Sequence, residues 1–260
     1  MKQFLKTYWK TLLFFAIVGL VGGFGVGLYV LDSYPPALRQ QLVDELVAGG
    51  LGDFPVCMLM GVLTAAQAAG YGLVLGAVGI WLGKQTGLWK DETSIEKKPL
   101  TVAVTIAIVG GLVMILPDLL FFNQHIPALM DSYSAKPTLP YLLATVTYGA
   151  VIEEVMLRLF FLSLTAFLLH KLFGKKRQLP SAGILIAANI VSALLFAAGH
   201  LPGTFLLLGD TPMIIFRCFL LNGGFGLLFG WLYRKYGLRY AMIAHGGCHV
   251  VSKLIWILFI

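Results

Sequence analysis

Ionisable side chains stand inside long apolar stretches of this chain, where their types and spacing could support proton transfer. Six of them are acids, bases or imidazoles within or beside such stretches: Glu153, Glu154, Arg158, His200, His245 and His249. A charged group at the centre of a bilayer costs about 2.5–3.5 kcal/mol on insertion scales, whereas a Leu or Ile returns only about 0.3–0.6 kcal/mol. We therefore expect these groups to face a protein interior or a wet cavity and to serve a function.

The two neighbouring glutamates differ in what can neutralise them. On a helix, Glu154 and Arg158 are four residues apart and can form a charge-assisted ion pair that offsets the desolvation of both groups. Glu153 lies about 100° around the helix and is less well placed for that arginine. A carboxylate in a low-dielectric pocket takes up a proton more readily, which suits a general base. The alternative is a buried salt bridge that only orients helices.

The histidines have a spacing that can serve chemistry. His245 and His249 are four residues apart, so both imidazoles project from the same side of a helix. The same spacing binds zinc in soluble metalloproteases, although a Glu follows the first His there and Gly246 stands in that place here. Histidines that only pack against neighbouring carbonyls are the alternative. His200 precedes Pro202, where a helix can kink and open space for water.

Transmembrane helices must position these residues. With 58% hydrophobic and 12% charged residues among 260, the chain is unlike an ordinary soluble enzyme or a disordered protein. Since about 20 apolar residues cross a bilayer, we predict an all-α, polytopic transmembrane helical bundle. It has about seven spans, at 11–31, 54–83, 100–122, 139–170, 181–209, 213–233 and 240–260.

Basic residues predict the orientation of this bundle. If the N-terminus is cytoplasmic, 14 of the 19 Lys and Arg fall in the inside segments 1–10, 84–98, 171–177 and 234–239. The opposite loops carry acidic residues, and Asp118 is counted among them. The net charge of +7 is then a positive-inside signature, so the bilayer is the expected partner and nucleic acid is not.

Glycines predict close helix packing. Gly19, Gly23 and Gly27 recur on one face of the first predicted helix, and small residues let helix backbones approach closely. Such faces also form dimer interfaces, but we favour packing within one subunit. No internal repeat or low-complexity linker interrupts the pattern, so residues 1–260 are interpreted as a single transmembrane domain.

Three short motifs follow one another on separate predicted helices: Glu153-Glu154-x-x-x-Arg158, Phe196-x-x-x-His200, and His245 with a polar residue four positions later. This order resembles the CPBP family of intramembrane proteases, also called Abi, which includes the type II CAAX prenyl endopeptidases. The run Gly230–Leu238 that leads into His245 is similar to the family's approach to its third motif. The resemblance covers a core of roughly 139–253, whereas residues 1–138 carry no recognisable motif.

The resemblance implies an intramembrane endopeptidase that hydrolyses a peptide bond of a membrane-anchored or lipidated substrate. Glu153 and His200 would activate the attacking water, and the Glu154 pair with Arg158 would hold the first motif in place. His245 and the residue four positions later would stabilise the oxyanion.

His249 departs from the family pattern, which usually has Asn or Asp at this position. A neutral imidazole still donates one hydrogen bond, so the oxyanion role survives. The extra imidazole also raises a zinc alternative, with a shell from Glu153, His200, His245 and His249. We favour the metal-free mechanism, without a cofactor. Phe196 and Asn222 are expected to line the chamber.

Two other functions stay open. The chain could be a non-proteolytic scaffold or immunity protein, or a proton-coupled transporter that uses the same buried charges. Inverted repeats would favour a transporter, and the sequence shows none. A shared site also requires His200 and His245 to lie at the same depth in the membrane. If the helix of His200 ended at this residue, the two histidines would lie at opposite membrane faces. Extension of that helix through Leu208 would bring His200 towards the middle of the membrane.

Overall fold

The computed structural model describes residues 2–52, 55–91, 94–174 and 177–260, which are helical without any strand in these ranges. The all-α prediction is therefore confirmed. The elements are α1 (Lys2–Ser33), α2 (Pro36–Ala48), α3 (Val56–Gly70), η1 (Tyr71–Leu75), α4 (Gly76–Thr86), α5 (Lys97–Leu120), η2 (Phe122–Gln124), α6 (Ala128–Ser134), α7 (Leu139–Leu143), η3 (Ala144–Glu153), η4 (Val155–Leu162), α8 (Ser163–Phe173), α9 (Ala182–Leu208), α10 (Pro212–Cys218), η5 (Phe219–Gly223), α11 (Gly224–Tyr236) and α12 (Leu238–Phe259).

Six helices of the described chain are long and apolar enough to cross a membrane. They are Lys2–Leu31, Val56–Thr86, Lys97–Gln124, Ala182–Leu208, Pro212–Tyr236 and Leu238–Phe259, and they correspond to six of the seven predicted spans. The remaining predicted span, 139–170, is helical from α7 through α8 but is not among the six. This helix carries the two glutamates and Arg158 near its middle, so its apolar character is the most interrupted of the seven.

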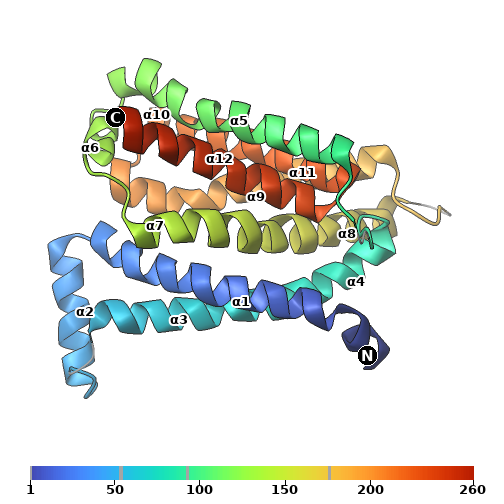
Figure 1. Ribbon diagram of the computed structural model, residues 1–260, viewed down its shortest axis with the longest axis horizontal. Coiled ribbons are helices and arrows are strands. Elements are labelled where there is room, and N and C mark those ends of the chain that lie inside the picture. The colour runs from blue at the N-terminus through green and yellow to red at the C-terminus, as the bar shows by residue number, and fades with distance from the viewer. Residues whose placement is uncertain (1, 53–54, 92–93, 175–176) are drawn as a thin grey trace.

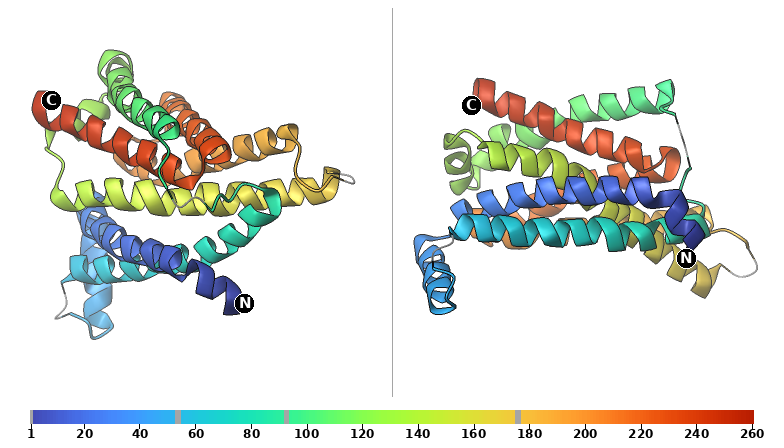
Figure 2. Two further views of the ribbon diagram at one scale, coloured as in Figure 1. Left: turned by 45° about the vertical axis from the view of Figure 1, so that its right-hand side comes forward. Right: turned by 60° about the horizontal axis from the view of Figure 1, so that its bottom comes forward.

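The charged helix lies at the centre of the bundle (Figure 1). Helices α1, α3 and α4 cover one side of it, and α5, α9, α11 and α12 cover the other (Figures 1 and 2). The ends of α4, α8 and α11 lie at the same end of the bundle as the N-terminus, while α6 and the C-terminus lie at the opposite end (Figure 1). The helix ends that the charge pattern assigns to the inside of the membrane therefore lie at the same end of the bundle.

Glycines of α1 do pack within the subunit. A Cβ added at any of the three would overlap backbone atoms of α3, in Ala68, Thr64 and Met60 for Gly19, Gly23 and Gly27 respectively. In addition, the Thr64 hydroxyl donates to the Gly23 carbonyl at 2.7 Å. Only glycine permits this approach of two helices, and the prediction of close packing inside one subunit is confirmed.

The central helix is π-helical over η3 and η4. Such i→i+5 turns are rare and occur most often at functional sites. The Ser192 hydroxyl of α9 donates to the Leu157 carbonyl at 2.7 Å, which gives this altered backbone a partner from a neighbouring helix. Sequence spacing did not predict the π-turns, because the spacing argument assumes 3.6 residues per turn.

Candidate active site

Glu154 is the centre of a buried ionic group. Its side chain is 0% exposed, and its Oε1 lies 3.1 Å from Arg158 Nη1 and 2.9 Å from His245 Nδ1. The predicted Glu154–Arg158 pair is therefore present, and it has an imidazole from α12 as a third member. Because a carboxylate accepts hydrogen bonds, Nδ1 carries the proton of this contact and Nε2 points to the other side of the ring. We call Glu153, Glu154, Arg158 and His245 the central cluster.

Aromatic rings enclose the charges of the central cluster. The Arg158 guanidinium lies 4.3 Å from the Phe196 ring centroid and 5.6 Å from that of Phe229. Its Nη2 donates to the Gly226 carbonyl at 3.4 Å. The His245 ring stacks on Phe229 at 4.6 Å. These contacts fix the cation and the imidazole in an apolar setting, where cation–π attraction offsets part of the desolvation. The expected chamber residue Phe196 is thus a wall of the cluster, whereas sequence reasoning missed Phe229.

Glu153 occupies a different position from its neighbour. Its Oε2 lies 4.0 Å from His245 Nε2, and its side chain is 22% exposed. Within the described residues it forms no ion pair with Arg158, in agreement with its predicted place around the helix. Glu153 is consequently the carboxylate of the cluster that an incoming molecule can reach.

Two imidazole nitrogens converge on one spot beside Gly149. A methyl group built on Gly149 would lie 3.4 Å from His249 Nε2 and 3.9 Å from His245 Nε2. The two rings stack at a centroid distance of 5.0 Å, so their Nε2 atoms face the same side. A side chain at position 149 would contact both rings, so the glycine keeps the space beside the two Nε2 atoms open.

His200 lies on α9 and contacts Phe196, a wall of the central cluster. Helix α9 runs through Pro202 to Leu208, so His200 does not lie at a helix end. Its Nδ1 donates to the Phe196 carbonyl at 2.8 Å, which leaves Nε2 as the free nitrogen. Its ring contacts Phe196 at 4.6 Å, and Phe196 in turn lies 6.0 Å from His245. Among the described residues, His200 forms no hydrogen bond or ion pair with Glu153 or His245.

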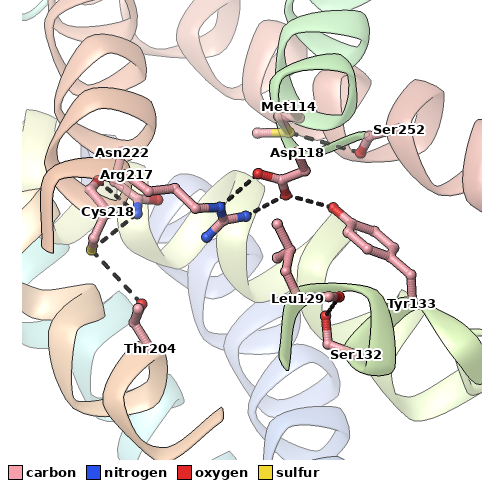
Figure 3. A network of polar contacts seen from close by, with 10 residues as sticks. All are labelled: Met114, Asp118, Leu129, Ser132, Tyr133, Thr204, Arg217, Cys218, Asn222 and Ser252. Carbon is pink, nitrogen blue, oxygen red and sulfur yellow. Dashed lines mark hydrogen bonds and ion pairs between the residues drawn. The ribbon is translucent and has the colours of Figure 1, made fainter. Parts of the chain in front are cut away.

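Asn222 forms no described hydrogen bond with the central cluster. Its Nδ2 donates to the Cys218 carbonyl at 3.1 Å, beside an ionic group in which Arg217 binds Asp118 (Figure 3). The Tyr133 hydroxyl also donates to Asp118, at 2.8 Å. We call Asp118, Arg217 and Tyr133 the Asp118 cluster. Asp118 was assigned to a loop, but it is fully buried near the end of α5, because Arg217 from α10 and Tyr133 from α6 close over it.

The geometry does not suit the zinc alternative. Among the described residues, no three His, Cys, Asp or Glu side chains are arranged to hold a metal ion. Glu154 already binds Nδ1 of His245, and the Phe196 carbonyl binds Nδ1 of His200, so each of these rings has only Nε2 left. In the part of the chain that the structure describes, the four residues of the zinc alternative are therefore not arranged as a metal shell.

Residues 135–251 match the family described as Rce1-like, type II CAAX prenyl endopeptidase. The match confirms the resemblance seen in the motifs and contains every candidate residue from Glu153 to His249. It supports an intramembrane protease of the CAAX type, and together with the six apolar helices an integral, multi-pass membrane protein. No curated protein and no solved structure matches the chain.

Proposed function

We propose that this protein is an intramembrane endopeptidase that hydrolyses a peptide bond of a membrane-anchored or lipidated substrate. The convergence of His245 Nε2 and His249 Nε2 beside Gly149, with Glu153 4.0 Å from His245 Nε2, carries the proposal. A carbonyl oxygen beside Gly149 would have two donors, and its carbon would lie near a reachable carboxylate. The Rce1-like match supports the same reaction class.

Glu153 acts as the general base in this mechanism. It takes a proton from the attacking water as the water oxygen bonds to the carbonyl carbon, and it returns that proton to the amine when the carbon–nitrogen bond breaks. His200 holds the same water through Nε2, because its Nδ1 is already bound to the Phe196 carbonyl. The proposal thus gives both groups the roles that the resemblance implied.

His245 and His249 stabilise the oxyanion. The central cluster holds two carboxylates and one guanidinium, so a protonated His245 makes it neutral overall. In that state Nδ1–H donates to Glu154 at 2.9 Å, and Nε2–H is available to the oxyanion. His249 contributes a second donor from Nε2. Glu154 and Arg158 act through His245, as positioning residues.

The test is hydrolysis of a farnesylated, fluorogenic peptide by purified protein in phosphatidylcholine nanodiscs. We expect cleavage by the wild type, unaffected by a metal chelator. Glu153→Gln should lower kcat by about 10²–10⁴-fold, the usual contribution of a general base, with the unfolding midpoint unchanged. Glu45→Gln is the matched control, because Glu45 is exposed on α2 and bonded only to Gln41. Full activity in Glu153→Gln would refute the mechanism.

A further inference from the structure

Helix α2 (Pro36–Ala48) connects the first two apolar spans and is hardly covered by the rest of the protein. The first span ends at Leu31 and the next begins at Val56, so only short connections separate α2 from either one. None of its residues is buried. The helix lies at the end of the bundle opposite the N-terminus, runs across the direction of α1 and α3, and extends past α3 (Figure 1). Because both neighbouring helices cross the membrane, α2 is held at the level of the lipid headgroups.

The side chains of α2 separate into an apolar and a polar half, because successive residues of a helix are turned by about 100°. The apolar half carries Leu38, Leu42, Val43, Leu46 and Val47. The polar half carries Gln40, Gln41, Asp44 and Glu45. A helix with two such faces lies in the plane of a membrane surface, with its apolar face about 5–10 Å inside the boundary between headgroups and acyl chains.

The polar half of α2 is suited to water, whereas the protein leaves part of the apolar half uncovered. Gln40 Nε2 donates to Asp44 Oδ1 at 2.9 Å, and Gln41 Nε2 donates to Glu45 Oε1 at 2.9 Å. Such bonds between exposed side chains four residues apart stabilise a helix surface in water.

On the other half, Leu38 and Val47 are 36% and 59% exposed. Burial of these two side chains in lipid would remove their apolar surface from water, which is favourable.

Arg39 places one cation in the middle of the apolar half. Its Nε is buried and has no hydrogen-bond partner in the described chain. Within the same ranges, its guanidinium forms no ion pair. A guanidinium among apolar side chains is costly unless an anion binds it, and its planar N–H groups match the oxygens of a phosphate. Phospholipid headgroups supply phosphates at the depth where the neighbouring spans end.

We propose that α2 binds the phospholipid surface of the membrane at this end of the bundle, with its apolar half among the upper acyl chains and Arg39 on a lipid phosphate. The polar half then faces water. This interaction does not depend on the proposed protease reaction. It holds the ends of α1 and α3 that α2 connects at the membrane surface.

Fluorescence quenching at two positions tests which half of α2 contacts lipid. Leu38→Cys and Gln40→Cys, about 160° apart around the helix, are each made in Cys57→Ser protein and labelled with a small fluorophore. The two remaining cysteines, Cys218 and Cys248, are buried. Each nanodisc holds one protein molecule, so a second copy cannot cover α2. The quenchers are phosphatidylcholine with a nitroxide near the headgroup end of its acyl chain, and iodide in the water.

The probe at Leu38 should lose most of its fluorescence to the nitroxide lipid and little to iodide, and the probe at Gln40 should show the reverse. Equal quenching at the two positions would overturn the proposal. Stronger quenching of the Leu38 probe by iodide would also overturn it, because the apolar half would then face water and await another partner.

Charge reversal at Arg39 tests the phosphate contact. In the Leu38→Cys background, Arg39→Glu should shift the quenching from the lipid towards iodide, because a carboxylate would face the lipid phosphates. Arg39→Lys should retain the lipid quenching. Gln41→Glu is the matched control, since it adds a negative charge to the polar half of the same helix and should leave the quenching unchanged. Identical quenching in Arg39→Glu and the parent, or an equal shift in Gln41→Glu, would overturn the assignment of Arg39 to a phosphate.

Discussion

The two buried ionic groups of this protein differ in how completely their charges are satisfied. In the Asp118 cluster, one carboxylate faces one guanidinium: Arg217 Nε donates to Oδ1 at 2.6 Å, and Nη2 donates to Oδ2 (Figure 3). Tyr133 adds a third donor to the same carboxylate. Bidentate geometry of this kind fixes three chain segments and leaves no oxygen for another molecule.

The central cluster is organised in the opposite way. It holds two carboxylates for one guanidinium, and Glu154 Oε2 and Arg158 Nε have no hydrogen-bond partner among the described residues. Glu153 remains partly exposed. The His245 imidazole lies against both carboxylates of this group, and the proposed mechanism uses its second nitrogen. We therefore interpret the saturated ion pair as structural and propose that the unsaturated one, beside a reachable carboxylate, is the reaction centre.

Glu154→Gln should have the largest effect, because it alters both the charge balance and the orientation of His245. Removing one partner of a buried ion pair costs about 3–5 kcal/mol, so the free energy of unfolding should fall by this amount. Activity should be lost as well, since His245 Nδ1 loses its anionic partner. Thermal unfolding and kcat, normalised to folded protein, measure the two effects; unchanged values for both would remove the distinction between the clusters.

Asp118→Asn should reproduce the loss of stability without the loss of activity. Arg217 would remain buried without its counter-ion, which costs about 3–5 kcal/mol. Tyr133→Phe, which removes only one hydrogen bond to the same carboxylate, should cost about 1.5–3 kcal/mol. The folded fraction of both variants should hydrolyse the peptide with a near wild-type kcat. A specific loss of kcat in Asp118→Asn would show that this cluster also takes part in the reaction.

His249→Leu should affect the rate and spare the stability. Loss of one oxyanion donor typically lowers kcat by about 10²–10³-fold. His249→Asn keeps a side-chain N–H donor and should retain most of the activity. Steady-state kinetics of the two variants separate a hydrogen-bond role from a packing role, because equal losses in both would indicate that the shape of the ring matters and its donor does not.

The smallest effect is expected at an exposed ionic contact, the pair of Lys84 and Asp91. Desolvation raises the pKa of Asp91, but hydrogen bonds from Trp89 and Tyr8 and the charge of Lys84 outweigh it and lower the pKa below its ordinary value. The folded-state pKa is depressed, so the resulting stability is present at neutral pH and is lost as the pH falls through that value. Because Asp91 is 58% exposed, Asp91→Asn should change the unfolding midpoint at neutral pH only slightly. A shift as large as that of Asp118→Asn would contradict this ranking.

Much of the candidate active site was predictable because its residues repeat at intervals of four. Glu154 with Arg158 and His245 with His249 each share a helix face, and bilayer energetics require such groups to meet inside the protein. Six of the spans followed from apolar length alone. The order of the motifs then indicated the family that residues 135–251 match.

Contacts between segments that are far apart in the sequence could not be predicted from the sequence alone. Nothing in the sequence pairs Glu154 with His245, whose positions differ by 91 residues, or places Phe229 under the imidazole. The π-turns of η3 alter which side of the central helix each residue faces, so the space beside Gly149 could not be located from a 3.6-residue period. Asp118 was misassigned because its partners, Arg217 and Tyr133, come from short helices that apolar length does not reveal.

Gly149→Ala tests the central claim most directly, because its methyl group would enter the spot on which the Nε2 atoms of His245 and His249 converge. The contacts of 3.4 and 3.9 Å are ordinary van der Waals distances, so the fold should tolerate the change. We predict a fall in kcat of about 10²–10³-fold, as for a disrupted oxyanion hole, with an unchanged or higher unfolding midpoint. Gly70→Ala, whose methyl group meets nothing within 4 Å, is the matched control. Full activity in folded Gly149→Ala protein would contradict the assignment of this spot as the oxyanion site.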